Sequence, residues 1–220
     1  MVKMKICGLT TEEDCEIMNC YHPDYCGFVF AGKKHRLTDQ KAALLRNVLS
    51  DTIPAVGVFV DEPIAHIVSL YTAGIIQIIQ LHGSEDEQYI QELREKIKQA
   101  KPDKTRKYEE FGEEIPIIKA VKIRTGKEIE KAEQLSCSML LLDAYDSNMA
   151  GGTGKQIDTG LIPKMNKPYI LAGGLNADNV TDALTQTRPY AVDISSGVES
   201  EGHKDWHKME KLMLVMEQYR

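Results

Sequence analysis

Short apolar stretches alternate with longer amphipathic stretches from one end of the chain to the other. Each apolar stretch is about five residues long and rich in β-branched side chains, which is typical of a strand. The stretches between them carry apolar residues at helical spacing. The predicted strands are Val2–Ile6, Tyr25–Phe30, Ala55–Val60, Ile75–Gln80, Ile117–Val121, Met139–Leu142, Tyr169–Ala172 and Ala191–Ile194.

Strands that are apolar throughout and joined by helices indicate a parallel sheet that is buried on both faces. Eight βα units in 220 residues predict an α/β fold, a single (βα)8 TIM barrel with eight parallel strands, as one domain over residues 1–220. An open, doubly wound sheet is the alternative. The stretch 101–114 interrupts the alternation with the dense charge of KPDKTRKYEEFGEE, and we interpret it as surface.

Residues that cap helices stand between the predicted strands. A Ser or Thr followed three residues later by Glu has the spacing of a capping box, in which each side chain bonds the other's backbone amide. Two pairs have this spacing, and two further residues are plain N-cap candidates: Thr10 with Glu13, Ser84 with Glu87, Thr38 and Asn176.

Composition narrows the class of protein. Hydrophobic residues make up 42% and charged residues 27% of the chain, as in an ordinary folded soluble protein. The net charge of −6 argues against nucleic acid or an anionic membrane surface as partner. There is no long apolar run or signal-like start, so we expect a cytoplasmic protein. The 5 cysteines form no CxxC pair and are expected to be free thiols.

Polar residues follow the predicted strands at the positions where a barrel builds its active site, the carboxyl ends of the strands. In chain order they are Cys7, Arg36, Asp61, His82, Lys122 and Arg124, Asp143, Gly173 and Gly174, and Ser195, Ser196 and Gly197. The sequence therefore predicts a polar site at one end of the barrel.

Glycine-bearing turns after the last two strands point to a phosphate. LAGGL and DISSGVE would expose backbone amides near helix starts, where an anion is favoured, although glycine also simply permits a tight turn. A third cluster, Gly151–Gly154, does not fit GxGxxG and precedes no GK[ST], so we interpret it as a loop that covers the phosphate. The expected ligand is a phosphorylated small molecule.

Cys7 and Asp143 are candidates for a base and an acid on opposite sides of the barrel mouth. A thiol needs a depressed pKa to act near neutrality, and Lys5 and Arg36 are candidate causes. Partial burial would raise the pKa of Asp143 and let it donate a proton. A structural cysteine and a helix cap or salt bridge remain alternatives for these two residues.

Two histidine positions are less informative. His82 could touch substrate or bond to a neighbouring loop, and the sequence leaves both open. His203 and His207 are four residues apart, but they lack the glutamate of HExxH and a third ligand, so no metal site is predicted.

Together these motifs resemble the phosphoribosylanthranilate isomerase family along nearly the whole chain. Any one motif is weak, but all occur in the family's order and at the expected barrel positions. They are KICGLT at 5–10, GFVF at 27–30 followed by Arg36, VGVF at 56–59, QLHG at 80–83, LLDA at 141–144, GGTG at 151–154, LAGGL at 171–175 and DISSGVE at 193–199.

The resemblance implies an Amadori rearrangement of N-(phosphoribosyl)anthranilate to carboxyphenylamino-deoxyribulose phosphate, a step of tryptophan biosynthesis. It implies that Asp143 is the general acid, that Cys7 is the general base and that Arg36 holds the anthranilate carboxylate. It also implies phosphate binding by Gly173, Gly174, Ser195, Ser196 and Gly197, with Gly154 from the covering loop. No cofactor and no metal are implied, since the protonated imine is itself the electron sink.

Two departures and two rivals accompany this resemblance. Lys33-Lys34-His35 precedes Arg36 where many members have a serine-proline step, and the charged stretch 101–114 is longer than usual. One rival is a histidine-pathway isomerase of the same barrel type, which would carry an aspartate in place of Cys7. The other is a catalytically silent barrel acting as a binding module. Monomer and homodimer both remain open.

Overall fold

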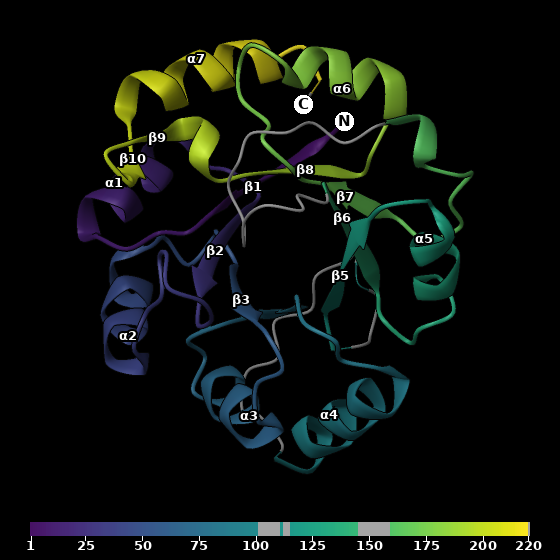
Figure 1. Cartoon of the computed structure of the whole chain (residues 1–220). Coiled ribbons are helices and arrows are strands. Elements are labelled where there is room, and N and C mark those ends of the chain that lie inside the picture. The colour runs from purple at the N-terminus through teal and green to yellow at the C-terminus, as the bar shows by residue number, and fades with distance from the viewer. Residues whose placement is uncertain (101–110, 112–114, 145–158, 220) are drawn as a thin grey trace.

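Eight parallel strands pair in chain order and close into a barrel, because β1 pairs with both β2 and β8 (Figure 1). This computed structural model describes residues 1–100, 111, 115–144 and 159–219. The strands are β1 (Lys3–Cys7), β2 (Tyr25–Val29), β3 (Ala55–Phe59), β4 (Ile78–Leu81), β5 (Ile117–Ile123), β6 (Met139–Ala144), β7 (Tyr169–Leu171) and β8 (Ala191–Ile194). The predicted barrel is confirmed, and the open sheet is wrong.

Helices surround the barrel and cover its outer face (Figure 1). They are α1 (Glu12–Tyr21), α2 (Asp39–Val48), α3 (Ile64–Thr72), α4 (Glu87–Ala100), α5 (Lys127–Ala132), α6 (Val180–Thr187) and α7 (Trp206–Met216), with short 3-10 turns η2 (Thr159–Leu161) and η3 (Ser196–Val198). Their apolar faces pack against outward side chains of the strands in one large core.

Alternate residues of each strand point into the barrel, where they form a second apolar cluster. This cluster includes Tyr25, Ile118, Leu141 and Ala191. Near the carboxyl ends of the strands, the residues whose side chains point into the barrel are polar instead of apolar. Strand periodicity alone therefore aims the side chains of Lys5, Cys7, Asp143 and Asp193 into the barrel.

Strand limits differ from the prediction where they matter for the site. β1 extends to Cys7 and β6 to Ala144, so Cys7 and Asp143 lie within their strands. β4 begins at Ile78 and not at Ile75. The reason is Gln77, whose side chain accepts from Ala55 N at 2.9 Å and donates to Gly74 O at 2.7 Å, which keeps the preceding residues in a turn.

The predicted helix caps are only partly right. Thr38 caps α2 as expected, accepting from Lys41 N. The capping box of α1 lies one residue later than predicted, on Thr11 and Asp14. The other two predictions are wrong because the side chains have other partners. Ser84 donates to Asp61, and Asp86 accepts from Tyr89 N near the start of α4 instead. Asn176 accepts from Asp178 N in the turn before α6, and the N-cap of α6 is Asn179.

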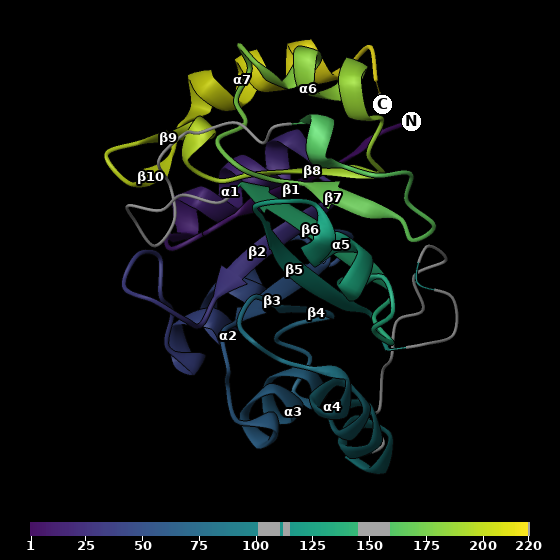
Figure 2. The ribbon, with the colours of Figure 1, turned by 45° about the vertical axis from the view of Figure 1, so that its right-hand side comes forward.

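A small hairpin was not predicted at all. β9 (Glu199–Ser200) and β10 (His203–Lys204) pair antiparallel after the η3 turn. The hairpin lies beside α1 in both ribbon views (Figures 1 and 2). It therefore connects the segment after β8 with the segment after β1.

Among the described helices, none is long and apolar enough to cross a membrane.

His66 links two helices through both of its ring nitrogens. Nδ1 lies 2.8 Å from Glu62 Oε1, and Nε2 lies 2.9 Å from Asp39 Oδ1 at the start of α2. Partial burial opposes a charged ring, but the two carboxylates outweigh it and raise the pKa of His66. A raised pKa means that the charged ring stabilises the folded state at pH values below the ordinary histidine pKa, and that this stabilisation is lost as the pH rises through the raised value.

We expect His66→Gln to cost more stability at pH 6 than at pH 9, by about 1 kcal/mol or less because the site is partly exposed. Urea unfolding at the two pH values measures this difference. His207→Gln, an exposed histidine of α7, is the control and should show no such pH dependence. An equal loss at both pH values would refute the charged link.

Candidate active site

Cys7 is the last residue of β1, and its side chain lies inside the carboxyl end of the barrel. The residue is only 8% exposed. It packs across Gly27 of β2, where an added Cβ would lie 2.5 Å from Cys7 Sγ. The thiol is thus held in place by a neighbouring strand that has no side chain at that position.

Lys5 and Asp193 form an ion pair directly below Cys7. The two residues stand opposite each other in the β1–β8 pairing, and Lys5 Nζ lies 2.9 Å from Asp193 Oδ1. The Lys5 side chain is fully buried. Burial opposes its charge, but Asp193 and Cys7 act in the other direction and raise the pKa of Lys5. Lys5 therefore carries a fixed positive charge beside the thiol.

The pKa of Cys7 is nevertheless raised, whereas a base that acts near neutrality needs a depressed pKa. Burial is the largest cause, because it disfavours the thiolate. Lys5 and Lys204 lower the pKa of Cys7 and Asp193 raises it. Arg36, the other cation proposed from the sequence, lies on an exposed loop. Near neutral pH the thiol is therefore protonated.

Asp143 projects from β6 next to His82. Its side chain is 26% exposed, so it sits in a partly dry position, and its Oδ2 lies 3.5 Å from His82 Nε2. On the other side of the ring, His82 Nδ1 is 3.0 Å from Gln80 Nε2 inside the barrel. Gln80 thus holds the ring with Nε2 facing Asp143.

The loop that carries His82 is fixed by a buried ion pair that the sequence did not suggest. Lys119 Nζ lies 2.9 Å from Glu85 Oε2 and donates to Gly83 O at 2.7 Å. Glu85 also accepts from the backbone amides of Asp61 and Gly83. Asp61, the polar residue that follows β3, has a lowered pKa because Ser84 donates to it, and it helps to shape this loop.

Arg36 lies at the same end of the barrel, on the exposed loop between β2 and α2. A backbone bridge joins it to Val29, and Leu37 N donates to Val29 O at 2.8 Å. His35, just before it, has a left-handed backbone with φ of 61°. The loop thus returns along the end of β2.

The two glycine turns lie against each other. Gly173 and Gly174 have φ of 99° and 62°, which other residues rarely adopt. Gly197 packs so closely on the first turn that an added Cβ would lie 2.0 Å from Leu175 O. Ser195 and Ser196 precede it at the end of β8. The predicted phosphate residues are therefore together, except Gly154 and the rest of the predicted covering loop, which lie outside the described residues.

Three features were missed from the sequence: the Lys5–Asp193 pair, the Lys119–Glu85 pair and a buried pair between Glu199 and Lys204 at 2.7 Å. A signal was present for the first of them. Lys5 and Asp193 occupy positions in β1 and β8 whose side chains point into the barrel, and a buried charge needs a partner. Glu199 also belongs to the DISSGVE motif.

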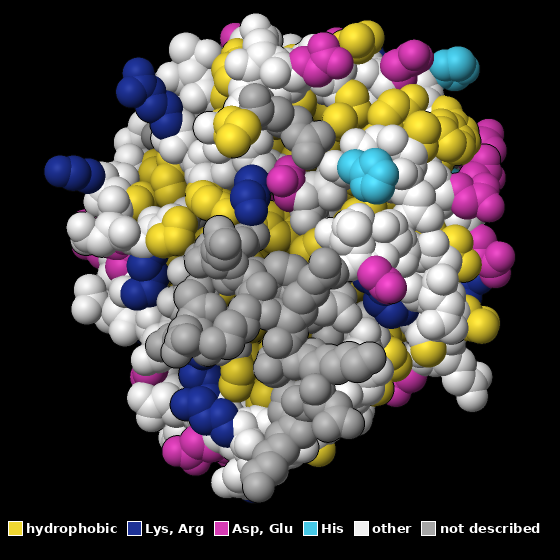
Figure 3. Space-filling model, turned by 180° about the vertical axis from the view of Figure 1, so that it is seen from behind, with side chains coloured by type: hydrophobic (Ala, Val, Ile, Leu, Met, Phe, Trp, Pro, Cys, Tyr) yellow, Lys and Arg dark blue, Asp and Glu magenta, His cyan; other side chains and the backbone are white. Residues whose placement is uncertain are grey.

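The remaining surface features suggest no other site. His203 Nδ1 lies 3.4 Å from Thr10 Oγ1, and the residues that the structure describes contain no group of three potential metal ligands. On the face shown in Figure 3, the coloured Lys and Arg side chains are dispersed among Asp and Glu. The arrangement as a whole can place an acid and a base on one ligand, with cationic or amide-rich loops at two ends.

Comparisons with known proteins agree with this arrangement. A model of the family "N-(5′-phosphoribosyl)anthranilate (PRA) isomerase" matches residues 4–112 and 99–214. An N-(5′-phosphoribosyl)anthranilate isomerase of Endomicrobium trichonymphae is 41% identical over 98% of this chain and 98% of its own length. A dimeric phosphoribosylanthranilate isomerase from Thermotoga maritima, solved as monomers, is 28% identical with a TM-score of 0.78 over 99% of this chain and 100% of that one.

A further solved structure contains a ligand. It is a phosphoribosyl anthranilate isomerase in complex with reduced 1-(o-carboxyphenylamino)-1-deoxyribulose 5-phosphate, with 28% identity and a TM-score of 0.74. The match covers 99% of this chain and 100% of that chain.

We expect Lys5→Met to raise the pKa of Cys7 further, because the ammonium that stabilises the thiolate is lost while Asp193 stays. The pH midpoint of Cys7 alkylation by iodoacetamide, followed on its peptide by mass spectrometry, should rise by about one unit or more. The double variant Lys5→Met/Asp193→Asn should have a lower midpoint than Lys5→Met, since the opposing anion is also gone. Lys122→Met, at an exposed lysine of the mouth, is the control. A midpoint that stays or falls in Lys5→Met would contradict the assignment.

Proposed function

Because the chain belongs to the N-(5′-phosphoribosyl)anthranilate isomerase family, we propose that it performs its isomerisation with Cys7 as the general base and Asp143 as the general acid. The protein is an isomerase of tryptophan biosynthesis. The observation that carries the residue assignment is that one thiol and one carboxyl group, on β1 and β6, face the same end of the barrel interior. Family membership sets aside the histidine-pathway alternative.

Ring opening is the task of Asp143. Its proton goes to the furanose ring oxygen, the bond from that oxygen to the first carbon breaks, and the nitrogen lone pair forms a protonated imine. His82 Nε2, 3.5 Å from Asp143 Oδ2, faces the carboxylate that this step leaves. We assign His82 to this carboxylate, whereas the sequence left open whether His82 touches substrate or bonds to a neighbouring loop.

Proton removal from the second carbon is the task of Cys7. The electrons of that C–H bond move into the imine and give an enolamine, which then tautomerises to the ketone. The positive imine lowers the pKa of a nearby thiol, and Lys5 supplies a second positive charge on the other side. All electrons stay within the substrate, so the sequence of steps needs no cofactor and no metal.

Two anionic ends of the substrate need two binding elements. Arg36 suits the planar anthranilate carboxylate, because its guanidinium offers two parallel donors. Gly173, Gly174, Ser195, Ser196 and Gly197 form the adjoining turns proposed for the phosphate, with Gly154 as a further contributor from the covering loop. A single-domain, cytoplasmic enzyme, either monomer or homodimer, that binds neither nucleic acid nor membranes is consistent with this role and stays part of the proposal.

Cys7→Ser and Asp143→Asn should each lower kcat/KM by about 10²–10⁴-fold, since each removes one positioned proton transfer. The substrate is generated from anthranilate and phosphoribosyl pyrophosphate with the transferase that joins them, and loss of its fluorescence gives the rate. Circular dichroism checks that both variants are folded. A wild-type protein without turnover would favour the silent barrel, and full activity in either variant would remove that residue from the mechanism.

Arg36→Met should raise KM by about 10- to 100-fold with little change in kcat, because a charge-assisted hydrogen bond to the bound carboxylate is lost. Arg36→Lys keeps the charge but not the fork, and its KM should fall between those of Arg36→Met and wild type. An unchanged KM in Arg36→Met would move carboxylate recognition to another residue.

A further inference from the structure

Glu199 is a buried carboxylate between the two loops proposed to bind the ends of the substrate. It opens β9, just after the turn of Ser195–Gly197. Its Oε1 accepts from Ser195 Oγ at 3.2 Å and from Lys204 Nζ at 2.7 Å. Its Oε2 accepts from Lys34 Nζ at 3.0 Å. One side chain therefore contacts both the phosphate turn and the loop that carries Arg36.

The contact with the Arg36 loop is completed by His35, the residue before Arg36. His35 Nε2 lies 3.2 Å from Glu199 Oε1, and its side chain is only 10% exposed. The His35 ring packs against Gly8, where an added Cβ would lie 2.8 Å from His35 Nδ1. Lys34, by contrast, has a side chain that is 60% exposed, so its ion pair contributes little. The buried contact with this loop is that of His35, whose Nε2 packs against Glu199 without the full geometry of a hydrogen bond.

On its other side, Glu199 is held by Lys204, whose side chain is fully buried. Lys204 Nζ also donates to Cys7 O at 2.6 Å and to Ser195 O at 3.3 Å. Its backbone amide donates to Asp14 Oδ1 at 2.8 Å. Burial opposes the charge of Glu199, but His35, Lys204 and Lys34 hold the pKa of this carboxyl well below its usual range. Glu199 is therefore ionised whenever the protein is folded near neutral pH.

We propose that Glu199 is a positioning residue that fixes, through His35, the distance between the Arg36 loop and the Ser195–Gly197 turn. This inference rests on the proposed function, in which one ligand carries a carboxylate at one end and a phosphate at the other. Holding both binding elements at the right spacing before the ligand arrives removes the entropic cost of ordering an exposed loop. Glu199 then determines how well the two anions are recognised as a pair, without touching either.

The test separates recognition of the whole substrate from recognition of phosphate alone. His35→Asn keeps a residue that tolerates a left-handed backbone, but its side chain is too short to reach Glu199. We expect its KM for phosphoribosylanthranilate to rise by about 10-fold, with kcat and the inhibition constant of inorganic phosphate within about twofold of wild type. A merely structural defect would alter kcat and phosphate inhibition as well.

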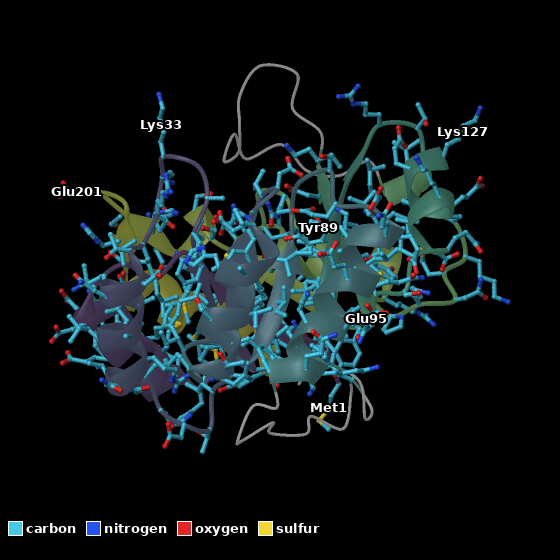
Figure 4. The ribbon with its side chains drawn as sticks, turned by 90° about the horizontal axis from the view of Figure 1, so that it is seen from below. Met1, Lys33, Tyr89, Glu95, Lys127 and Glu201 are labelled. Carbon is cyan, nitrogen blue, oxygen red and sulfur yellow. The ribbon has the colours of Figure 1, made fainter. Side chains whose placement is uncertain are left out.

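Glu199→Gln should raise both KM and the phosphate inhibition constant, because it also loosens the Ser195 turn. The double variant with His35→Asn should have the same KM as Glu199→Gln alone, since both remove one link. The controls are Lys33→Met and Glu201→Gln, exposed residues of the same loop and the same hairpin, which project at the end of the molecule opposite Met1 (Figure 4). Both should leave KM unchanged.

Three outcomes would overturn the inference. The first is a KM for His35→Asn equal to that of Lys33→Met while wild type is active, which leaves the proposed function intact. The second is additive effects of His35→Asn and Glu199→Gln on KM. The third is a wild-type protein without turnover, which overturns the proposed function and this inference together. Thermal unfolding of each variant checks that it is folded. If Glu199→Gln does not fold, the comparison of His35→Asn with Lys33→Met still tests the inference.

Discussion

Closure of the barrel by pairing β1 with β8 is the constraint on which the rest of the site depends. That pairing sets Lys5 opposite Asp193 and carries Cys7 to the end of the strand, next to the turn of Ser195. Without it, β1 and β8 would be the two edges of an open sheet, and the thiol, its neighbouring ammonium and the phosphate turn would lie far apart. The chemistry at this end of the barrel therefore follows from hydrogen bonds between the first and last strands.

Three buried lysine–carboxylate pairs gather at this end of the barrel: Lys5–Asp193, Lys119–Glu85 and Lys204–Glu199. Moving each charge out of water costs about several kcal/mol, and the mutual attraction of a pair roughly offsets that cost. Such pairs are therefore weak sources of stability. Their value here is geometric. Lys119 donates to the backbone of Gly83 and Lys204 to the backbone of Cys7 and Ser195, while Lys5–Asp193 joins the first strand to the last.

The barrel and most of the site could be predicted from the sequence because both depend on local periodicity. Apolar runs gave the strands, and the polar residues after them gave Cys7, Asp143 and the glycine turns. The Lys5–Asp193 pair could not be found in this way, because its two residues lie almost a whole chain apart, as do the two residues of the hydrogen bond from Lys204 Nζ to Cys7 O. Only strand register and hairpin docking bring them together. The helix cap predicted at Ser84 was wrong for a related reason, because the Ser84 side chain donates to Asp61 of another loop.

The pKa of Cys7 shows why strand position alone cannot define a base. The sequence offered Lys5 and Arg36 as candidate causes of a depressed pKa, whereas burial inside the barrel outweighs Lys5 and Lys204 and raises the pKa of Cys7. In the proposed mechanism, Cys7 ionises only beside the protonated imine, and this imine forms only after the acid has transferred its proton. Asp143 therefore acts before Cys7 in this mechanism. The raised pKa also protects Cys7 from alkylation and oxidation when no substrate is bound, because the thiolate is the reactive form.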